Sequence, residues 1–320
     1  MANPSIHVAV LKGGDSPEAA VSRSSAAGVA GALEAQPGIE CTEIELDQNL
    51  VPALQACSPD VVFPVLHGPP GEDGTIQGLL EMMGLSYVGS AVQPSAFAMD
   101  KSVAKALFAR EGLPLAKDLV VTDAETPAAI AGKILQELGP AVVIKPMQLG
   151  SSLGVTPLPN GGDLEDAVKT AFEYGSRILI EPFVMGREIT VGILDLVGKP
   201  AQALPVTEIQ TASGEWYDYH NRYTAGASEH IIPAPMSDTL ATQLQTIALQ
   251  AHECLGLRDL SRADFIVTDS DEVVLLEVNS LPGMTPTSLY PDSARAAGYE
   301  FGELMVELVR CALARRAAEG

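Results

Sequence analysis

In the first 95 residues, short strand-like runs, glycine turns and one long periodic stretch follow one another in a regular order. Apolar runs at residues 6–11 and 60–66 predict strands, residues 40–46 have a strand pattern between them, and the periodic stretch at 19–35 predicts a helix. This order is typical of a parallel α/β sheet. Functional residues of such sheets gather at the carboxyl ends of the strands, where this chain carries KGG and HGPPGEDG.

Two further blocks follow, so we predict domains at 1–95, 96–184 and 185–320. The second block has helical periodicity at 101–111 and 128–138, and strand patterns at 118–122, 141–145 and 178–181. The third has strand patterns at 188–196, 201–208, 261–268 and 273–278, and helices at 238–255 and 301–315. Residues 209–233 are polar, aromatic-rich and without periodicity, which predicts a lid over an active site.

The strongest chemical signal is the segment SRADFIVTDSDEVVLLEVNSLPG, which predicts a β-hairpin with its turn at 269–272. Alternate residues of a strand share a face, so pairing brings Asp264 near Glu277 and Asn279. Two carboxylates and an amide oxygen suit Mg²⁺ that bridges nucleotide phosphates. The alternative is ordinary strand-edge polarity. A carboxylate inside the apolar run VVLLEVN favours the metal, because an unpaired buried charge is costly.

A second signal is the turn GSSLG after the apolar strand AVVIKP. Backbone N–H groups of such a turn can surround a phosphate, although the turn is neither a P-loop nor a Rossmann fingerprint and could be only flexible. Lys145, embedded in the apolar strand, either extends to solvent or meets an anion. His67, after the third strand, is either a functional residue or a satisfied loop residue.

The composition of the chain excludes several classes of protein. The 320 residues are 47% hydrophobic and 19% charged, which is globular and large enough for two or three domains. The net charge of −22 argues against a nucleic-acid partner and an anionic membrane surface. The four cysteines lack metal-ligand spacing, and no apolar stretch approaches the ~20 residues needed to cross a bilayer. We therefore expect reduced cysteines and a cytoplasmic protein.

The motifs GGxSxExxVS, VLHGxxGEDGxxQG, MDK, IKPxxxGSSxG, YDYxxxY, ADF and ExNxxPGMTxxS occur in this order over residues 13–289. This set resembles the D-alanine–D-alanine ligase family of ATP-grasp enzymes. The resemblance implies a three-domain α/β ATP-grasp ligase with an N-terminal parallel α/β sheet domain. It also implies a carbon–nitrogen ligase that forms D-alanyl-D-alanine through an acyl phosphate, for peptidoglycan precursors. ATP and two Mg²⁺ ions, with Mn²⁺ as a substitute, are the implied cofactors, and a homodimer is implied by analogy alone.

The resemblance also assigns roles to individual residues. Nucleotide contacts fall to Lys101 and Lys145 (phosphates), Gly150, Ser151 and Ser152 (the covering loop), Glu181, Phe183 and Val184 (the adenine hinge) and Glu188 (ribose). Metal ligands are Asp264, Glu277 and Asn279. Arg262 and the Gly283 amide face the oxyanion, and Tyr223 pairs with Ser151. Amino-acid contacts fall to Glu18, His67, Arg222, Ser288 and Leu289.

Four positions depart from the family pattern. Ala20 stands where a glutamate would hold the first substrate's ammonium, and Arg222 stands where the lid usually has lysine. Leu149 and Thr287 also differ, at positions where Glu and His are common. The sequence therefore leaves two enzymes open: a D-alanine ligase in which Glu18 or another group binds the ammonium, or a paralogue that joins a different amino or hydroxy acid. A binding protein without catalysis is the third hypothesis, disfavoured because Arg262 and all three metal ligands are present.

Overall fold

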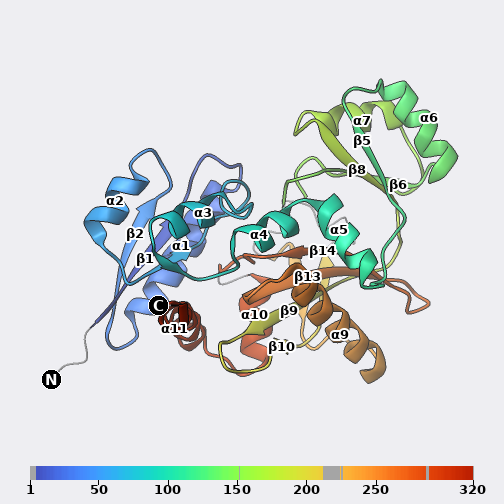
Figure 1. Cartoon of the computed structure of the whole chain (residues 1–320). Coiled ribbons are helices and arrows are strands. Elements are labelled where there is room, and N and C mark those ends of the chain that lie inside the picture. Colours follow the sequence, from blue (N-terminus) through green and yellow to red (C-terminus); the bar gives the residue numbers. More distant parts are fainter. Residues whose placement is uncertain (1–4, 151, 212–223, 225, 286–287, 320) are drawn as a thin grey trace.

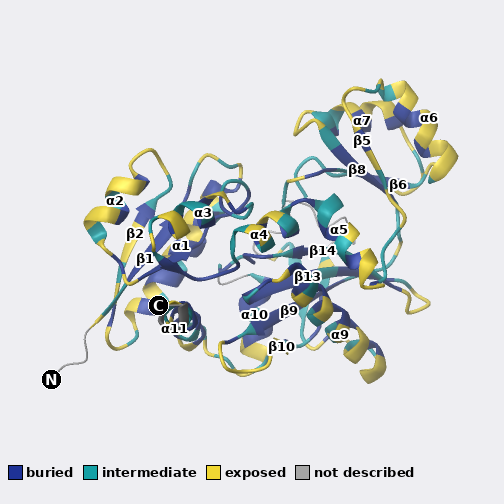
Figure 2. Cartoon of the chain, in the orientation of Figure 1, coloured by how far each residue is buried: buried dark blue, intermediate teal, exposed yellow. Residues whose placement is uncertain are grey.

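The computed structural model describes residues 5–150, 152–211, 224, 226–285 and 288–319. The chain forms three lobes, each built around one β-sheet (Figure 1). Buried residues concentrate in the sheets and on the helix faces that cover them (Figure 2). The α/β fold class predicted from the sequence is confirmed.

The N-terminal lobe holds a parallel sheet in the order β2-β1-β3-β4. Its strands are β1 (Ile6–Lys12), β2 (Ile39–Glu45), β3 (Val61–Pro64) and β4 (Ser86–Tyr87), and its helices are α1 (Ala19–Glu34), α2 (Leu50–Cys57) and α3 (Thr75–Met82). β1 and β3 are almost wholly apolar because helices cover both of their faces. Gly13 and His67 follow these strands at the same edge of the sheet, as the sequence predicts.

The second lobe is a small antiparallel sheet covered by two helices. Its strand order is β5-β8-β6-β7, from β5 (Leu119–Thr122), β6 (Val142–Pro146), β7 (Thr156–Leu158) and β8 (Arg177–Pro182), with helices α6 (Pro127–Glu137) and α7 (Leu164–Phe172). Its core is a separate apolar cluster centred on Ile130, Ile144 and Ile180. This lobe therefore meets the rest of the chain chiefly through the ends of β6 and β8.

The third lobe holds a six-stranded sheet with the path β12-β11-β9-β13-β14 and β10 beside β9. Its elements are β9 (Arg187–Asp195), β10 (Gln202–Ala203), β11 (Thr207–Thr211), β12 (Ser228–Ile231), β13 (Asp259–Val267), β14 (Val273–Asn279) and α9 (Asp238–Leu255). The single strand predicted at 201–208 is wrong. Two short strands occupy this region, and Pro205, which lacks an N–H donor, lies between them.

Two pairs of helices cross between lobes, one directly after the N-terminal sheet and one at the end of the chain. α4 (Val92–Met99) and α5 (Lys101–Arg110) contribute Ala98, Ala104 and Phe108 to the core of the third lobe. α10 (Leu289–Ala296) leads to α11 (Phe301–Glu319), whose Leu304, Met305, Leu308 and Val309 pack into the core of the N-terminal sheet. Each sheet lies within one of the predicted domain ranges, but these helices pack against sheets that are distant from them in sequence.

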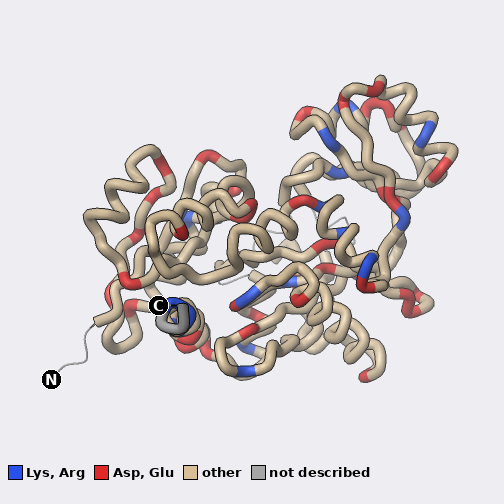
Figure 3. Tube along the Cα trace, viewed as in Figure 1, with Lys and Arg blue, Asp and Glu red and all other residues tan. Residues whose placement is uncertain are grey.

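Acidic residues occur over all three lobes, with the few cations between them (Figure 3). Cys41, Cys57, Cys254 and Cys311 are all free thiols. No helix in the described part of the chain is long and apolar enough to span a membrane.

Candidate active site

The two predicted metal-binding carboxylates face each other across neighbouring strands. Asp264 on β13 pairs with Glu277 on β14, and Arg262 pairs with Asn279. Alternate residues share a face, so the four side chains gather on one side of the sheet. The register shifts directly after Asp264, a β-bulge of the kind that re-aims side chains beside functional sites. The predicted hairpin is confirmed.

Asp264 is held by neighbours on three strands. The guanidinium of Arg262 donates to both of its oxygens, from Nε at 2.8 Å and from Nη2 at 2.7 Å. The hydroxyl of Thr190 on β9 donates to Oδ1 at 2.6 Å, and Asn279 Nδ2 donates to Oδ2 at 3.1 Å. These contacts fix the carboxylate in place and keep the oxyanion candidate Arg262 directly beside it.

Asp264, Glu277 and Asn279 fit a magnesium ion. They offer two carboxylates and one amide, an oxygen donor set without sulfur or imidazole. Mg²⁺ commonly takes one or two carboxylates and fills its remaining positions with water and substrate phosphates. These residues would therefore hold the ion where a nucleotide could share it.

A narrow cavity opens between the second and third sheets. Its lining residues come from both sheets and from the segments joining them: Ala116, Val143, Lys145, Glu181, Pro182, Phe183, Val184, Ile266, Val274 and Leu276. It is mainly apolar with one charged wall, which suits a planar heterocycle with polar edges. Glu188, the predicted ribose contact, lies on β9 opposite Ile266 of this cavity.

Glu181 forms the charged wall together with two lysines. Its side chain is 3% exposed and accepts from Lys145 Nζ at 2.6 Å and from Lys105. Burial alone would raise the pKa of Glu181, but the two lysines outweigh burial and the pKa lies below its usual value. Burial likewise opposes the charge of Lys145, but Glu181 and Glu277 raise its pKa. Both groups are therefore charged at neutral pH, and Glu181 is committed to the lysines.

Lys101 connects the glycine-rich loop to the metal-binding acids. Its Nζ donates to the Leu149 carbonyl at 2.8 Å and lies 3.2 Å from Glu277 Oε2. A second small cavity beside it is lined by residues of both regions, including Gly150, Glu277 and Asn279. Lys101 thus lies where phosphates would pass from the loop to the metal ligands. Ser152, the next described loop residue, has a positive φ of 58°.

Glu18 lies on the amino-acid side of the site. It is 4% exposed, and a Cβ added to Gly68 or to Gly150 would lie 3.4 Å from its Oε2. Its carboxylate therefore lies between the loop after β3 and the glycine-rich loop. Ala20, by contrast, is exposed on α1. The exposure of position 20 favours Glu18 over that position as the partner of the first ammonium, and the prediction made for Ala20 stays a prediction.

His67 and Glu72 extend this polar wall. His67 is 7% exposed, and its Nε2 has no hydrogen-bond partner among the described residues. Burial lowers the pKa of His67, with Arg262 acting in the same direction and Glu18 against both, which leaves a neutral imidazole. Burial and Glu18 raise the pKa of Glu72 to about 8, although its carboxylate accepts from Gly68 N at 2.7 Å.

The segment before α10 has the arrangement of an anion cradle. Ser288 is the N-cap of α10, which begins at Leu289, and its hydroxyl accepts from Thr285 N at 3.0 Å instead of capping the helix. A Cβ on Gly283 would lie 3.0 Å from Ser288 Oγ, so the Gly283 backbone is close to the helix N-terminus. Free N–H groups at this end favour a carboxylate.

Some predicted residues lie outside the described residues: Ser151, Arg222, Tyr223 and Thr287. Most of the predicted lid at 209–233 is also outside them. Its flanks β11 and β12 are described and pair antiparallel, with Thr211 opposite Ser228.

Comparison with known proteins decides the family. The family model described as D-ala D-ala ligase C-terminus matches residues 107–310, and the model described as D-ala D-ala ligase N-terminus matches residues 39–90. The first of these alone spans more than half of the chain. The chain belongs to the D-alanine–D-alanine ligase family.

Relatives in this ligase family match over nearly the whole chain. The D-alanine–D-alanine ligase of Moorella thermoacetica is 42% identical over 309 residues, covering 96% of this chain and 99% of that protein. The ligase of Rhizobium meliloti is 42% identical over 314 residues, covering 95% and 98%. The ligase of Bacillus anthracis complexed with ATP superposes with a TM-score of 0.84 at 29% identity, covering 99% and 100%.

Three site residues were not found by sequence reasoning. Lys105 lies one helical turn after Lys101 and on the buried face with Phe108, a position where an unpaired lysine would be costly. The place of Lys105 in the helical pattern could therefore have identified it as a site residue. Glu72 is hidden in a glycine-rich loop and Thr190 in an apolar strand, and both gain their roles only through contacts distant in sequence.

Proposed function

We propose that this chain is an ATP- and Mg²⁺-dependent ligase that joins two D-alanine molecules, supplying the dipeptide for peptidoglycan precursors in the cytoplasm. The observation that carries the proposal is the register pairing of Asp264 with Glu277, which places Arg262 and Asn279 in the same cluster. The relatives that bear the name D-alanine–D-alanine ligase support it. The implied homodimer stays a prediction.

The reaction has two balanced steps. A carboxylate oxygen of the first D-alanine attacks the γ-phosphorus of ATP, the bond to ADP breaks, and an acyl phosphate forms. The amine nitrogen of the second D-alanine attacks the acyl carbon and loses a proton, and inorganic phosphate leaves with the electrons of the broken C–O bond. Magnesium on Asp264, Glu277 and Asn279 would offset charge on the transferring phosphoryl group.

Protein groups already in place match these steps. Lys145 and Lys101 are fixed by Glu181 and by the Leu149 carbonyl, so their charges need little reorganisation when phosphates bind. Arg262 and the Gly283 N–H would stabilise the tetrahedral oxyanion, an interaction worth about 3–4 kcal/mol per donor. Glu18, buried between two loops, is the group available to bind the first ammonium.

ADP release over a panel of substrates tests the proposal. The purified chain with ATP and Mg²⁺ should release ADP with D-alanine alone and give D-alanyl-D-alanine by mass spectrometry. L-alanine, or D-alanine without Mg²⁺, should give only background. ADP release only with a mixed pair, such as D-alanine with D-lactate or D-serine, would instead identify a paralogue. No ADP release with any pair would identify a binding protein.

A further inference from the structure

A third cavity lies away from the ligase site, where the N-terminal sheet meets the last helix. Its volume is about 630 Å³. The lining residues come from the α3–β4 edge, the start of α4, the turn before β13, and α11: Glu81, Gly84, Leu85, Ser86, Tyr87, Ala91, Arg258, Ala312, Arg315 and Arg316. We call it the seam cavity. Cavities of this size hold nucleotide-sized or smaller molecules.

The seam cavity collects cations in an acidic protein. Its lining side chains include the guanidinium groups of Arg258, Arg315 and Arg316, with one carboxylate, Glu81. The chain as a whole carries 41 acidic residues against 19 lysines and arginines. Arg315 is paired with Asp259, but Arg258 and Arg316 repel each other, and an anion between these two would relieve that repulsion.

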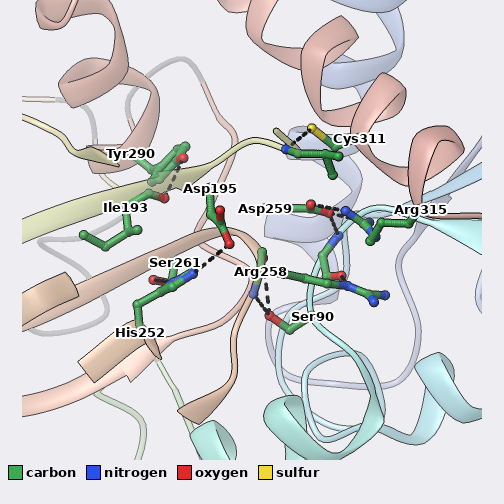
Figure 4. Close-up of polar contacts among 12 residues, drawn as sticks. Ser90, Ile193, Asp195, His252, Arg258, Asp259, Ser261, Tyr290, Cys311 and Arg315 are labelled. Carbon is green, nitrogen blue, oxygen red and sulfur yellow. Dashed lines mark hydrogen bonds and ion pairs between the residues drawn. The ribbon is translucent and has the colours of Figure 1, made fainter. Parts of the chain in front are cut away.

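Two of the arginines are held rigidly. Arg315 pairs with the fully buried Asp259, through Nη2 at 2.8 Å and through Nη1 (Figure 4). Its Nη2 also donates to the Tyr87 carbonyl at 3.0 Å. Arg258 lies 5.2 Å from the centroid of the Tyr87 ring, and its Nε donates to the Gly89 carbonyl at 2.9 Å. Pre-set guanidinium groups lose little side-chain entropy when they bind an anion.

Donors remain available in the same cavity. Within the described part of the chain, no acceptor contacts the Nη atoms of Arg258, and the exposed Arg316 has no ion pair. Ser86 is 8% exposed, and its buried hydroxyl has no hydrogen-bond partner among the described residues. Because this hydroxyl has almost no accessible surface, a molecule in the cavity reaches the two guanidinium groups and not the Ser86 hydroxyl.

We propose that the seam cavity binds a small organic oxyanion, a phosphate or carboxylate compound, through the guanidinium groups of Arg258 and Arg316. The planar fork of arginine matches both phosphate and carboxylate oxygens. Tyr87, Leu85 and Ala312 give the cavity an apolar portion for the body of the molecule. The site is independent of the ligase reaction, since it shares no lining residue with the cavities beside Lys101 and Lys145.

Calorimetric titration of the full chain with inorganic phosphate, and separately with citrate, tests this proposal. The double variant Arg258→Ala/Arg316→Ala should bind at least one of the two probes about 10-fold or more weakly than the unaltered chain, since about tenfold corresponds to the loss of one charged contact. Arg310→Ala, an exposed position on α11 outside the cavity, is the matched control and should bind both probes normally. Arg316→Ala alone, at an exposed helix position, tests the site if the double variant folds poorly.

The probe that the variant loses tells which class of ligand the cavity binds. A loss confined to phosphate identifies a phosphate ligand, and a loss confined to citrate identifies a carboxylate ligand. Equal binding by the double variant and the unaltered chain would overturn the proposal. So would binding abolished by Lys145→Ala, because the probe would then occupy the ligase site. The unaltered chain could instead bind neither probe and sediment as a dimer that Arg316→Glu dissociates. That result would assign the cavity to contact with a second copy of the chain and overturn the proposal.

Discussion

Carboxylates around the candidate active site meet different neighbours, and their charge differs accordingly. Two lysines lower the pKa of the buried Glu181 in spite of its burial. Burial and the charge of Glu18 raise the pKa of Glu72 to about 8. Neighbours in space therefore set the protonation of each acid.

The raised pKa of Glu72 predicts a pH-dependent stability. A carboxyl that binds its proton more tightly when folded destabilises the native state progressively as pH rises from its ordinary pKa of 4.5 to about 8. Glu72→Gln removes this penalty, since the amide oxygen can still accept from Gly68. Urea unfolding should show the variant's advantage growing by about 4 kcal/mol between pH 5 and pH 8.5. A constant difference across that range would contradict the assignment.

Glu277 is expected to be indispensable for turnover. Glu277→Gln removes one oxygen charge from the predicted metal site and should lower kcat by at least about 100-fold, with circular dichroism and melting temperature nearly unchanged. Glu272→Gln is the control, because it removes the same charge from the exposed turn of the same hairpin and should be silent. An unaltered rate in Glu277→Gln would reject the metal assignment.

Substitutions at Glu18 and Ala20, two residues apart, are expected to have different effects on substrate binding. Glu18→Gln removes a buried negative charge beside both substrate loops, so the KM for the first D-alanine should rise about 10–100-fold, equivalent to about 1–3 kcal/mol. Ala20→Glu restores the common family residue at an exposed position and should leave the KM unchanged. Initial rates over a D-alanine series measure both. A lower KM in Ala20→Glu would support the interpretation made from the sequence.

At the scale of elements, the β13–β14 hairpin was predictable because strand alternation and the turn residues agree on one register. The bulge after Asp264 was not predicted: Leu276 of β14 is its extra residue, and the apolar run VVLLEVN carries no turn or glycine signal at that point. The break between β10 and β11 could have been read from Pro205, which cannot donate within a continuous strand.

Two glycines should respond in opposite ways to alanine. A Cβ at Gly186 would lie 2.4 Å from the Val267 carbonyl oxygen, a backbone atom of the neighbouring strand that cannot move aside. Gly186→Ala should therefore destabilise the chain by about 2–3 kcal/mol. Gly31 lies in helix α1 with nothing within 4 Å of an added Cβ, so Gly31→Ala should stabilise by about 0.5–1 kcal/mol. Denaturant unfolding measures both, and equal effects would contradict the packing argument.

At the scale of the whole molecule, three sheets are joined by helices that pack far from their sequence neighbours. Helix α11 completes the core of the N-terminal sheet, and α5 brings Lys101 and Lys105 between the second and third lobes. The ligase site and the seam cavity both depend on these crossings.

The net charge of −22 predicts that salt stabilises the chain. Self-repulsion among acidic residues opposes the compact state, and ions screen it. Raising KCl from about 20 mM to about 300 mM should increase the melting temperature by a few degrees. Tetramethylammonium chloride is the control and should give the same gain. A gain with K⁺ alone would point to a bound cation, and a decrease would contradict the repulsion argument.

The sequence by itself determined the α/β class, the β13–β14 hairpin that carries the predicted metal ligands, and the family, because these depend on local periodicity and on residue order. Only the tertiary structure decided which acids are charged, that Lys105 shares Glu181, and that Ala20 faces solvent while Glu18 is buried. These properties depend on burial and on charges brought together from distant segments, and the spacing of residues along a chain does not contain that information.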